Sequence, residues 1–368
     1  MEDMFRFADE FGPARIIQIY RPSLDLKAVV VVDNTAGGPS IGGVRMAPDV
    51  SVEECVRLAR AMTWKNAAAG LPHGGGKSVI LGDPRLPPAQ KERIIRAFAG
   101  AIHDLADYIP GPDMGTDETC MGWIKDEIGR AVGLPAAVGG IPLDEIGATG
   151  FGLAACINVA RTFIGLELKG ARVVVQGFGA VGKHAARFLA AQDVILVAAS
   201  DSHGTLADPA GLDVAALIAL KNDGRHLCDH PDGQKLETDA VLDIPCDIWI
   251  PAARPDVVRA DNVARLNTRL VAQGANIPCT PEAEKELHAR GVLVVPDFIA
   301  NAGGVICAAI EYHGGTQRAA FDYIDERIRA NTRLVLESAR STGAMPRTAA
   351  LSLAKERVLA ASATRRWR

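Results

Sequence analysis

Short apolar runs alternate with helical stretches through the second half of the chain. Residues 172–176 form one apolar run, residues 183–192 have the spacing of a helix, and residues 194–200 form a second apolar run. This order predicts a βαβ unit. Three further apolar runs predict that the strands continue into a doubly wound parallel sheet, at residues 247–250, 269–272 and 292–295.

The first half of the chain mixes element types. Residues 27–32 predict a buried strand, and residues 51–66 predict a helix that opens with the capping box Ser51-x-x-Glu54. Helical patterns return after Gly303 and continue through residues 321–340 and 351–360. The change of pattern around Gly139-Gly140-Ile141-Pro142 predicts a domain boundary near residue 140, and the expected fold class is therefore α/β with two domains.

Composition narrows the class of protein. The chain has 368 residues, 48% of them hydrophobic and 23% charged, which is enough for two separate cores. A formal net charge of -4 gives no general attraction to nucleic acid or to an anionic membrane. The seven cysteines are scattered without a C-x-x-C pair, which favours reduced thiols in a cytoplasmic protein, with no disulfide framework and no metal site. The start, Met1-Glu2-Asp3-Met4, has no secretory signal, and no apolar run is long enough for a transmembrane helix.

A glycine fingerprint lies inside the predicted βαβ unit. Its six residues are Gly177, Phe178, Gly179, Ala180, Val181 and Gly182, and they join the first strand to its helix. Glycines let the backbone approach a pyrophosphate, whose charge the helix N-terminus stabilises. Asp201 ends the next strand about 20 residues further on, where an acid accepts hydrogen bonds from ribose hydroxyls. An acid there repels a 2′-phosphate, which favours NAD over NADP. A glycine turn that only packs strand against helix is the alternative.

Two asparagines follow predicted strands of the same sheet. Asn276 ends the segment Gln273-Gly274-Ala275-Asn276, and Asn301 precedes Ala302-Gly303-Gly304. Ligands in such sheets bind beyond the carboxyl ends of the strands, so both asparagines are expected on one rim with Gly177. Each alone is equally well explained as a turn residue. Because both asparagines are expected on the same rim of the sheet, ligand contact is favoured over a turn role.

Two lysines stand at either end of a glycine-rich segment. Lys65 continues the buried stripe of the helix at residues 51–66, and Lys77 follows Gly74-Gly75-Gly76 directly, on what we expect to be a loop. Burial disfavours the ammonium form and lowers the pKa of a lysine, which suits it to acid–base work. For Lys65 the alternative is a side chain that reaches water from the helix end. A P-loop is disfavoured because the first glycine of that motif would fall at Leu71 and the flanking elements are reversed.

Buried lysines require an anion. The segment Pro110-Gly111-Pro112-Asp113-Met114-Gly115-Thr116-Asp117 predicts a loop by its proline and glycine content. A carboxylate there could pair with Lys77 and pass protons. Asp113 is the preferred residue and Asp117 the alternative, although an isolated loop aspartate is more often a helix cap.

Taken together, these motifs resemble the glutamate/leucine/phenylalanine/valine dehydrogenase family over nearly the whole chain. The resemblance rests on Lys65-Asn66, Gly74 to Lys77, Gly111-Pro112-Asp113, Ala148-Thr149-Gly150, Gly177 to Gly182, Gln273 to Asn276 and Asn301 to Gly304. It implies a substrate-binding and oligomerisation domain at residues 1–140 plus about 325–368. It also implies a Rossmann NAD-binding domain at residues 141–324, a cleft between the two, and a homo-oligomer, hexamer or octamer.

Roles for individual residues follow from the resemblance. It implies that Lys65 binds the substrate α-carboxylate, that Lys77 is the catalytic lysine and that Asp113 transfers protons. Further substrate contacts are implied at Gly42, Gly43, Asn301 and Val305. Cofactor contacts are implied at Thr149, Ala252, Asn276 and Asn301, besides the fingerprint and Asp201. The implied reaction is reversible oxidative deamination of an L-amino acid to a 2-oxo acid and ammonia.

Two positions bear on the substrate's side chain. Glutamate-type members have a lysine just before the Gly-Gly that matches Gly42-Gly43, and a serine seven residues after the asparagine that matches Asn301. This chain has Ile41 and Ala308 there. An apolar pair cannot satisfy a buried carboxylate, so we expect a substrate of leucine, valine or phenylalanine type. Gly111, where leucine-type members usually have alanine, is expected to leave room for an aromatic ring.

Other interpretations remain open. From Pro112 onward the sequence is more like the glutamate type, as in Ser200 to Thr205 and Pro278 to Glu282, so glutamate dehydrogenase is the alternative. A non-catalytic NAD-binding protein is a second alternative, against which the presence of Lys65, Lys77 and Asp113 speaks.

Overall fold

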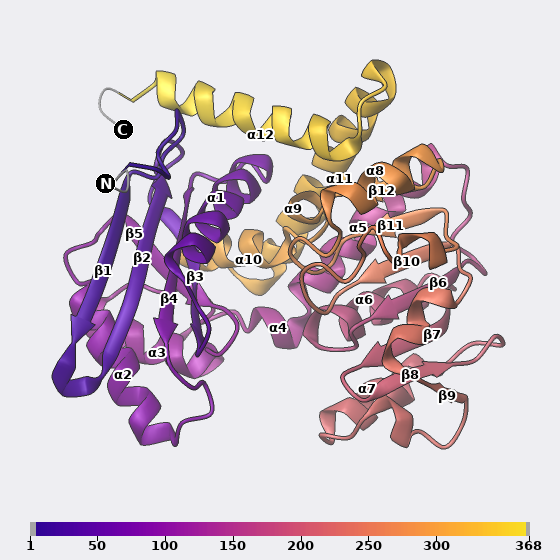
Figure 1. The fold of residues 1–368 in the computed structure, drawn as a ribbon, viewed down its shortest axis with the longest axis horizontal. Coiled ribbons are helices and arrows are strands. Elements are labelled where there is room, and N and C mark those ends of the chain that lie inside the picture. Colours follow the sequence, from indigo (N-terminus) through magenta and orange to yellow (C-terminus); the bar gives the residue numbers. More distant parts are fainter. Residues whose placement is uncertain (1–4, 366–368) are drawn as a thin grey trace. The chain divides into compact units, whose positions relative to one another are not determined.

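The computed structural model describes residues 5–365, so the acidic start Met1 to Met4 lies outside the described residues. Two compact units divide the chain. The first comprises Met1–Leu143, Val305–Ala320 and Leu353–Arg368, and the second comprises Asp144–Gly304 and Phe321–Ser352. Figure 1 shows the chain coloured along its sequence.

A five-stranded mixed sheet forms the base of the first unit. Its strands, in spatial order, are β1 (Arg15–Arg21), β2 (Leu26–Asn34), β4 (Gly74–Leu81), β3 (Ser40–Ala47) and β5 (Tyr108–Pro112). Strand β3 runs parallel to both of its neighbours, β4 and β5. Side chains from two strands can therefore meet above β3 wherever β3 itself leaves space.

Three helices of the first unit are α1 (Val52–Ala68), α2 (Pro88–Ala101) and α3 (Glu118–Ile128). Helix α1 begins as expected, because Ser51 caps it and accepts a hydrogen bond from the Glu54 backbone N–H. Its buried face includes Cys55, Leu58, Lys65 and Asn66. This face packs on β4, the strand that carries Lys77.

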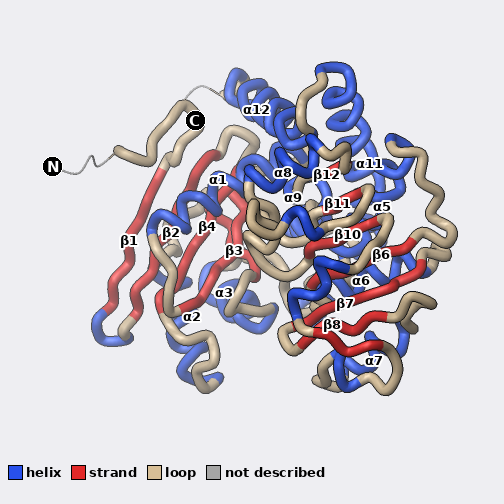
Figure 2. The backbone as a smooth tube through the Cα atoms, turned by 45° about the vertical axis from the view of Figure 1, so that its right-hand side comes forward, coloured by secondary structure: helices blue, strands red, loops and turns tan. Residues whose placement is uncertain are grey.

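The second unit contains the predicted parallel sheet. Its spatial order is β12 (Leu293–Val295), β11 (Leu270–Ala272), β10 (Ile248–Pro251), β6 (Arg172–Gln176), β7 (Ile195–Asp201), β8 (Gly204–Ala207) and β9 (Gln234–Leu236). Strands β12 to β7 are parallel, whereas β8 and β9 extend the sheet in antiparallel fashion, which the sequence pattern did not indicate. Figure 2 shows these strands in red, bordered by helices in blue.

The remaining helices follow α3 along the chain. They are α4 (Leu143–Ile146), α5 (Ala148–Phe163), α6 (Ala180–Ala190), α7 (Val214–Asn222), α8 (Pro281–Ala289), α9 (Asp297–Ala300), α10 (Gly303–Tyr312), α11 (Gln317–Thr342) and α12 (Pro346–Ala363). Most of α10 and the second part of α12 belong to the first unit, and the other helices belong mainly to the second. We expected residues from about 325 onward in the first unit, but residues 321–352 belong to the second. The reason is specific packing: Phe321 contacts Phe151 at 4.8 Å between ring centroids, and Arg347 pairs with Glu284 and Asp297.

Two glycine- and proline-rich segments are strands, which corrects the predicted loops. Gly74, Gly75 and Gly76 form the start of β4, where a methyl group on Gly75 would lie 2.0 Å from the Thr63 nitrogen of α1. The glycines therefore serve close helix–strand packing. Pro110, Gly111 and Pro112 end β5, which tolerates proline because it is an edge strand.

Candidate active site

Lys77 and Asp113 form an ion pair inside the first unit. Their Nζ and Oδ2 atoms are 2.9 Å apart, and the two side chains are only 5% and 17% exposed. Lys77 comes from β4 and Asp113 directly follows β5, so the two side chains meet above the intervening strand β3. Gly43 of β3 makes this possible: a methyl group there would lie 2.7 Å from Asp113 Cβ and 3.1 Å from Lys77 Nζ.

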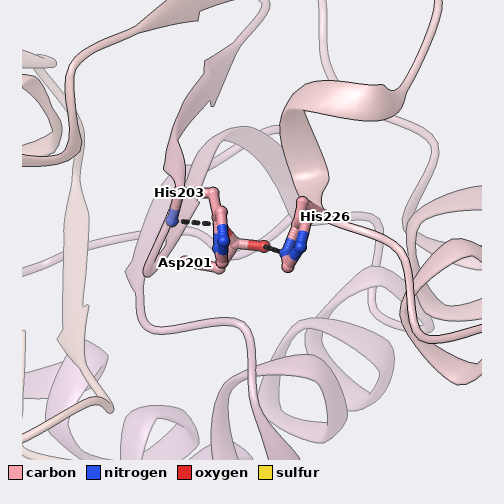
Figure 3. Close-up of side chains that lie close together, drawn as sticks. All are labelled: Asp201, His203 and His226. Carbon is pink, nitrogen blue, oxygen red and sulfur yellow. Dashed lines mark hydrogen bonds and ion pairs between the residues drawn. The ribbon is translucent and has the colours of Figure 1, made fainter.

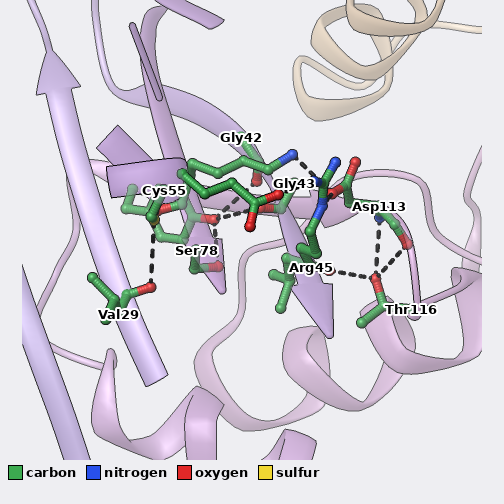
Figure 4. A network of polar contacts seen from close by, with 12 residues as sticks. Val29, Gly42, Gly43, Arg45, Cys55, Ser78, Asp113 and Thr116 are labelled. Atoms are coloured by element: carbon green, nitrogen blue, oxygen red, sulfur yellow. Dashed lines mark hydrogen bonds and ion pairs between the residues drawn. The ribbon is translucent and has the colours of Figure 1, made fainter. Parts of the chain in front are cut away.

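A second cation, Arg45, touches the same carboxylate, as Figure 4 shows. Its Nε donates to Asp113 Oδ2 at 2.9 Å. Burial alone raises the pKa of Asp113, but the Lys77 and Arg45 cations outweigh burial and hold that pKa below its ordinary value. Asp113 is consequently ionised at neutral pH. Arg45 is not among the residues predicted from the sequence, although it lies two residues beyond Gly43 and therefore on the same face of β3.

The other two candidates of this region separate clearly. Asp117, the alternative to Asp113, is the cap of α3 and accepts a hydrogen bond from the Cys120 backbone N–H at 2.9 Å. Capping of α3 accounts for Asp117 without a catalytic role. Lys65 is 7% exposed in the last turn of α1, so it does not extend into water as the alternative interpretation required.

Ile41 and Ala308 lie in one apolar cluster of the first unit. Its buried members are Ile41, Ile109, Val132, Ala308 and Ala309, with Leu71 packed against them. Ile41 shares the face of β3 that carries Gly43 and Arg45, because residues two apart in a strand point the same way. The apolar cluster therefore begins two residues along β3 from Gly43, the residue next to which Lys77 and Asp113 meet.

Gly111 lies against the same apolar cluster. A methyl group at Gly111 would lie 3.1 Å from Val132 Cγ2. Val305 lies one helical turn before Ala308 on α10 and is half-buried. Glu311, one turn further on, accepts hydrogen bonds from the backbone N–H groups of Leu134 and Ile141 at 3.2 and 2.6 Å. Both carboxylate oxygens of Glu311 therefore accept hydrogen bonds from the backbone.

In the second unit, the glycine turn has the geometry that a pyrophosphate requires. Gly177 has φ +93°, and a methyl group on Gly182 would lie 2.0 Å from the Gly177 oxygen. Gly179 is the N-cap of α6 and has open space around it, with no side chain capping the helix. The first N–H groups of α6 are therefore free of side-chain acceptors, as a phosphate site requires. These residues fit a dinucleotide.

The two asparagines come together as expected from their strand ends. Asn301 Nδ2 donates to Asn276 Oδ1 at 3.1 Å and to the Gly274 oxygen at 3.2 Å. Its Oδ1 is buried without a hydrogen-bond partner among the described residues, which suits a ligand donor. Thr149 lies close to Gly303, where a methyl group would be 3.1 Å from Thr149 Cα. Ala252 donates its N–H to the Gln176 oxygen at the end of β6.

Asp201 ends β7 but is not a free acid. Its Oδ2 accepts hydrogen bonds from Lys221 Nζ at 2.8 Å and from the Leu227 N–H at 3.0 Å, and its Oδ1 accepts from the His203 N–H. Burial raises its pKa, yet these donors together bring the pKa below its usual range. The negative charge of Asp201 is therefore paired with the Lys221 ammonium.

Asp201, His203 and His226 offer ligand atoms within 4.8 Å of one another (Figure 3). The two imidazole rings stack with their centroids 3.4 Å apart and 24° between their planes. A metal ion binds in the plane of an imidazole, so two stacked rings cannot share one ion. Lys221 also occupies Asp201 Oδ2. This group is therefore not a cation site in the present arrangement.

Comparison with known proteins identifies the family of the chain. Residues 139–366 match the family model "Glutamate/Leucine/Phenylalanine/Valine dehydrogenase", and residues 15–130 match "Glu/Leu/Phe/Val dehydrogenase, dimerisation domain". The class is that of the amino acid dehydrogenases, oxidoreductases that act on CH–NH₂ groups with a nicotinamide cofactor. The chain belongs to the Glu/Leu/Phe/Val dehydrogenase family.

Several relatives are named for glutamate. The chain is 38% identical to glutamate dehydrogenase of Aeropyrum pernix, over 91% of this chain and 85% of that protein. Hetero-hexameric glutamate dehydrogenase of Thermus thermophilus, solved in a leucine-bound form, has a TM-score of 0.87 at 30% identity and covers 97% of this chain and 91% of its own. L-tryptophan dehydrogenase of Nostoc punctiforme has a TM-score of 0.72 at 26% identity, covering 96% and 97%.

Within residues 5–365, no helix combines the length and apolar character needed to cross a membrane. The seven cysteines are all free thiols.

Proposed function

We propose that the protein catalyses the NAD-dependent oxidative deamination of an L-amino acid with an apolar side chain, reversibly, to the 2-oxo acid and ammonia. The observation that carries this proposal is the apolar cluster around Ile41 and Ala308. A glutamate side chain placed there would bury a carboxylate without a partner, at a cost of several kcal/mol.

The roles of the polar side chains follow from their placement. Lys65, buried in the last turn of α1, is proposed to bind the substrate α-carboxylate. Lys77, in its neutral form, takes a proton from the water that attacks the imine carbon, which gives a carbinolamine. Asp113 receives and returns the proton of the amino group until ammonia leaves and the 2-oxo acid remains. The bound nicotinamide supplies the acceptor for the hydride from the substrate Cα.

The cofactor is proposed to lie along the glycine turn from Gly177 to Gly182. The uncapped start of α6 would hold its pyrophosphate, and Asn276, Asn301 and Thr149 would hold its nicotinamide end. NAD is the proposed cofactor because Asp201 ends β7, where an acid would accept hydrogen bonds from the ribose hydroxyls. Asp201 is paired with Lys221, and one relative from Pyrobaculum calidifontis, 36% identical, is named an NADP(+)-dependent glutamate dehydrogenase.

Glutamate dehydrogenase is the second candidate. The names of the relatives at 36–38% identity favour it. It would require a cationic partner for the side-chain carboxylate, which neither Ile41 nor Ala308 can supply. A homo-oligomer is also proposed, on the match of residues 15–130 to the dimerisation domain of the family. A cytoplasmic location stays a prediction.

The test is the formation of NADH at alkaline pH with single amino acids. We expect leucine, valine or phenylalanine to give a kcat/KM at least about 100-fold above that of glutamate, as expected where a buried charge lacks its partner. A higher value for glutamate would refute the apolar assignment. Bound NAD without a rate on any amino acid would instead indicate a non-catalytic protein. Repeating the panel with NADP measures the cofactor preference.

A further inference from the structure

Arg45 occupies an unusual place in the first unit. It lies on β3, on the same face as Ile41 and Gly43, and its side chain is only 13% exposed. The empty face of Gly43 gives Lys77 and Asp113 room to meet, and Arg45 reaches the same carboxylate from further along the strand. Along one face of β3, the apolar Ile41, the side-chain-free Gly43 and the cationic Arg45 therefore follow one another.

Both cations contact one oxygen of Asp113. Lys77 Nζ and Arg45 Nε each lie 2.9 Å from Oδ2. The described residues give Oδ1 no hydrogen bond, so the carboxylate is fixed by one oxygen and open at the other. The backbone of Asp113 is held separately, because its N–H donates to Thr116 Oγ1 at 3.1 Å (Figure 4). Orientation of the side chain thus depends on Arg45 and Lys77 alone.

The other end of the Arg45 guanidinium is anchored. Its Nη1 donates to Glu54 Oε1, a residue in the first turn of α1. A rigid planar fork that bridges two carboxylates is a geometry that lysine cannot reproduce. The ionic groups around Asp113 are Lys77 on β4, Arg45 on β3 and, behind it, Glu54 on α1. Tyr108 and Cys55 are neutral neighbours, since burial raises the pKa of both.

We propose that Arg45 is a positioning residue for the deamination: it holds Asp113 ionised, with Oδ2 turned inward and Oδ1 presented to the amino group of the substrate. This inference rests on the proposed function. Lys77 must be neutral during part of the cycle, and at that stage Asp113 would lose its counter-charge. Arg45 remains charged throughout because a guanidinium does not deprotonate in proteins. Asp113 therefore keeps one cation at every stage.

A purely structural role predicts something different. If Arg45 only linked α1 to β3, its loss would lower stability and leave the pH dependence of catalysis unchanged. Arg60 on α1 provides a matched control, because it also bridges two carboxylates, those of Asp9 and Asp33. It has no contact with Lys77 or Asp113 among the interactions of the described residues. Substitution of Arg60 should affect stability only.

The experiment measures kcat and KM across pH for Arg45→Met, Arg45→Lys and Glu54→Gln, with Arg60→Met as control. We expect Arg45→Met to lower kcat about 100-fold with KM within about 3-fold, as misplacement of a reacting group does. Removing a cation raises the proton affinity of the remaining groups, so the acid limb of kcat/KM should move about one unit to higher pH. Arg45→Lys should return the acid limb of kcat/KM to its wild-type pH and recover part of kcat. Glu54→Gln should cost less than Arg45→Met.

The results separate the possible failures. An unchanged acid limb in Arg45→Met, with a kcat loss no larger than that of Arg60→Met, would overturn the positioning role. Should Arg45→Met not fold, Arg45→Lys decides: a wild-type kcat there contradicts the role of the fork, and a roughly 10-fold loss supports it. Inactivity of the wild-type protein on every amino acid would refute the proposed function instead.

Discussion

Two buried clusters of arginine and carboxylate, one in each unit, differ in how completely they are satisfied. In the second unit, Arg347 contacts Glu284 and Asp297, whose side chains are each 5% exposed. Gln273 completes that cluster by donating to Glu284 and accepting from Arg347 and the Asp297 N–H. In the first unit, Asp113 keeps one oxygen open beside Lys77 and Arg45.

This difference distinguishes buried charges that stabilise the fold from buried charges that are available to a ligand. A closed network fixes packing, because every donor and acceptor has a partner and removal of one leaves an unpaired charge. An open network costs stability and is useful only if a ligand completes it. The Arg347 cluster is closer to the first kind, because all four carboxylate oxygens of Glu284 and Asp297 accept hydrogen bonds, and the Asp113 cluster is of the second kind.

Loss of the catalytic amine should have the largest effect. Lys77→Ala is expected to lower kcat by about 10³-fold or more, because no other amine replaces the acid–base group. Asp113 would keep Arg45 as its partner, so the protein should fold and bind NAD normally. Initial rates with NAD and the best amino acid, together with calorimetric NAD binding, provide the check. A variant with a tenth of the wild-type rate would remove Lys77 from this role.

Loss of Arg347 should act on stability instead. Arg347→Met leaves Glu284 and Asp297 buried without their cation, which should lower the free energy of unfolding by about 3–5 kcal/mol. The control Arg265→Met breaks exposed pairs with Asp239 and Asp243 and should cost at most about 1 kcal/mol. Urea unfolding measures both, and kcat at low temperature should be near wild type. Equal stabilities of the two variants would contradict the contrast between the clusters.

Polarity introduced into the apolar cluster should shift the substrate preference. Ile41→Lys combined with Ala308→Ser provides a cation and a hydroxyl where both side chains are now buried among apolar groups. The ratio of kcat/KM for glutamate to that for leucine should rise about 100-fold. Ile41→Leu with Ala308→Gly, which keeps the cluster apolar, is the control. If the ratio stays unchanged in the first variant, these positions do not contact the substrate.

The smallest effect concerns acid stability. The pKa of Asp113 is lowered on folding, so the pair stabilises the folded state above the ordinary carboxyl pKa and ceases to do so as pH falls through the folded-state value. Asp113→Asn should therefore be less stable than wild type at pH 7. The difference in melting temperature should shrink below a pH of about 4. A difference that grows toward acid pH would mean that Asp113 is protonated in the folded protein.

Much of the second unit could be predicted from the sequence because its strands are buried on both faces and read as continuous apolar runs. The glycine turn was equally clear, since only glycine fits φ +93° at Gly177. The strand at Gly74 to Gly76 has no apolar pattern, so it looked like a loop. Residues 321–352 were assigned to the wrong unit because ion pairs such as Arg347–Glu284 leave no local signal.

The candidate site was predictable in its motifs and not in its electrostatics. Lys77 and Asp113 stood out by neighbouring glycines and prolines. Arg45 and Lys221 did not, because a single charged residue in a strand or helix looks like a solvated surface group. Only the tertiary structure brings them onto Asp113 and Asp201.

One competition experiment tests the central claim most directly. The protein is incubated with NAD and equal concentrations of leucine and glutamate, and the 2-oxo acids formed are identified by mass spectrometry. An apolar cluster beside the Lys77–Asp113 pair predicts 4-methyl-2-oxopentanoate as the main product. Accumulation of 2-oxoglutarate in its place would contradict the account.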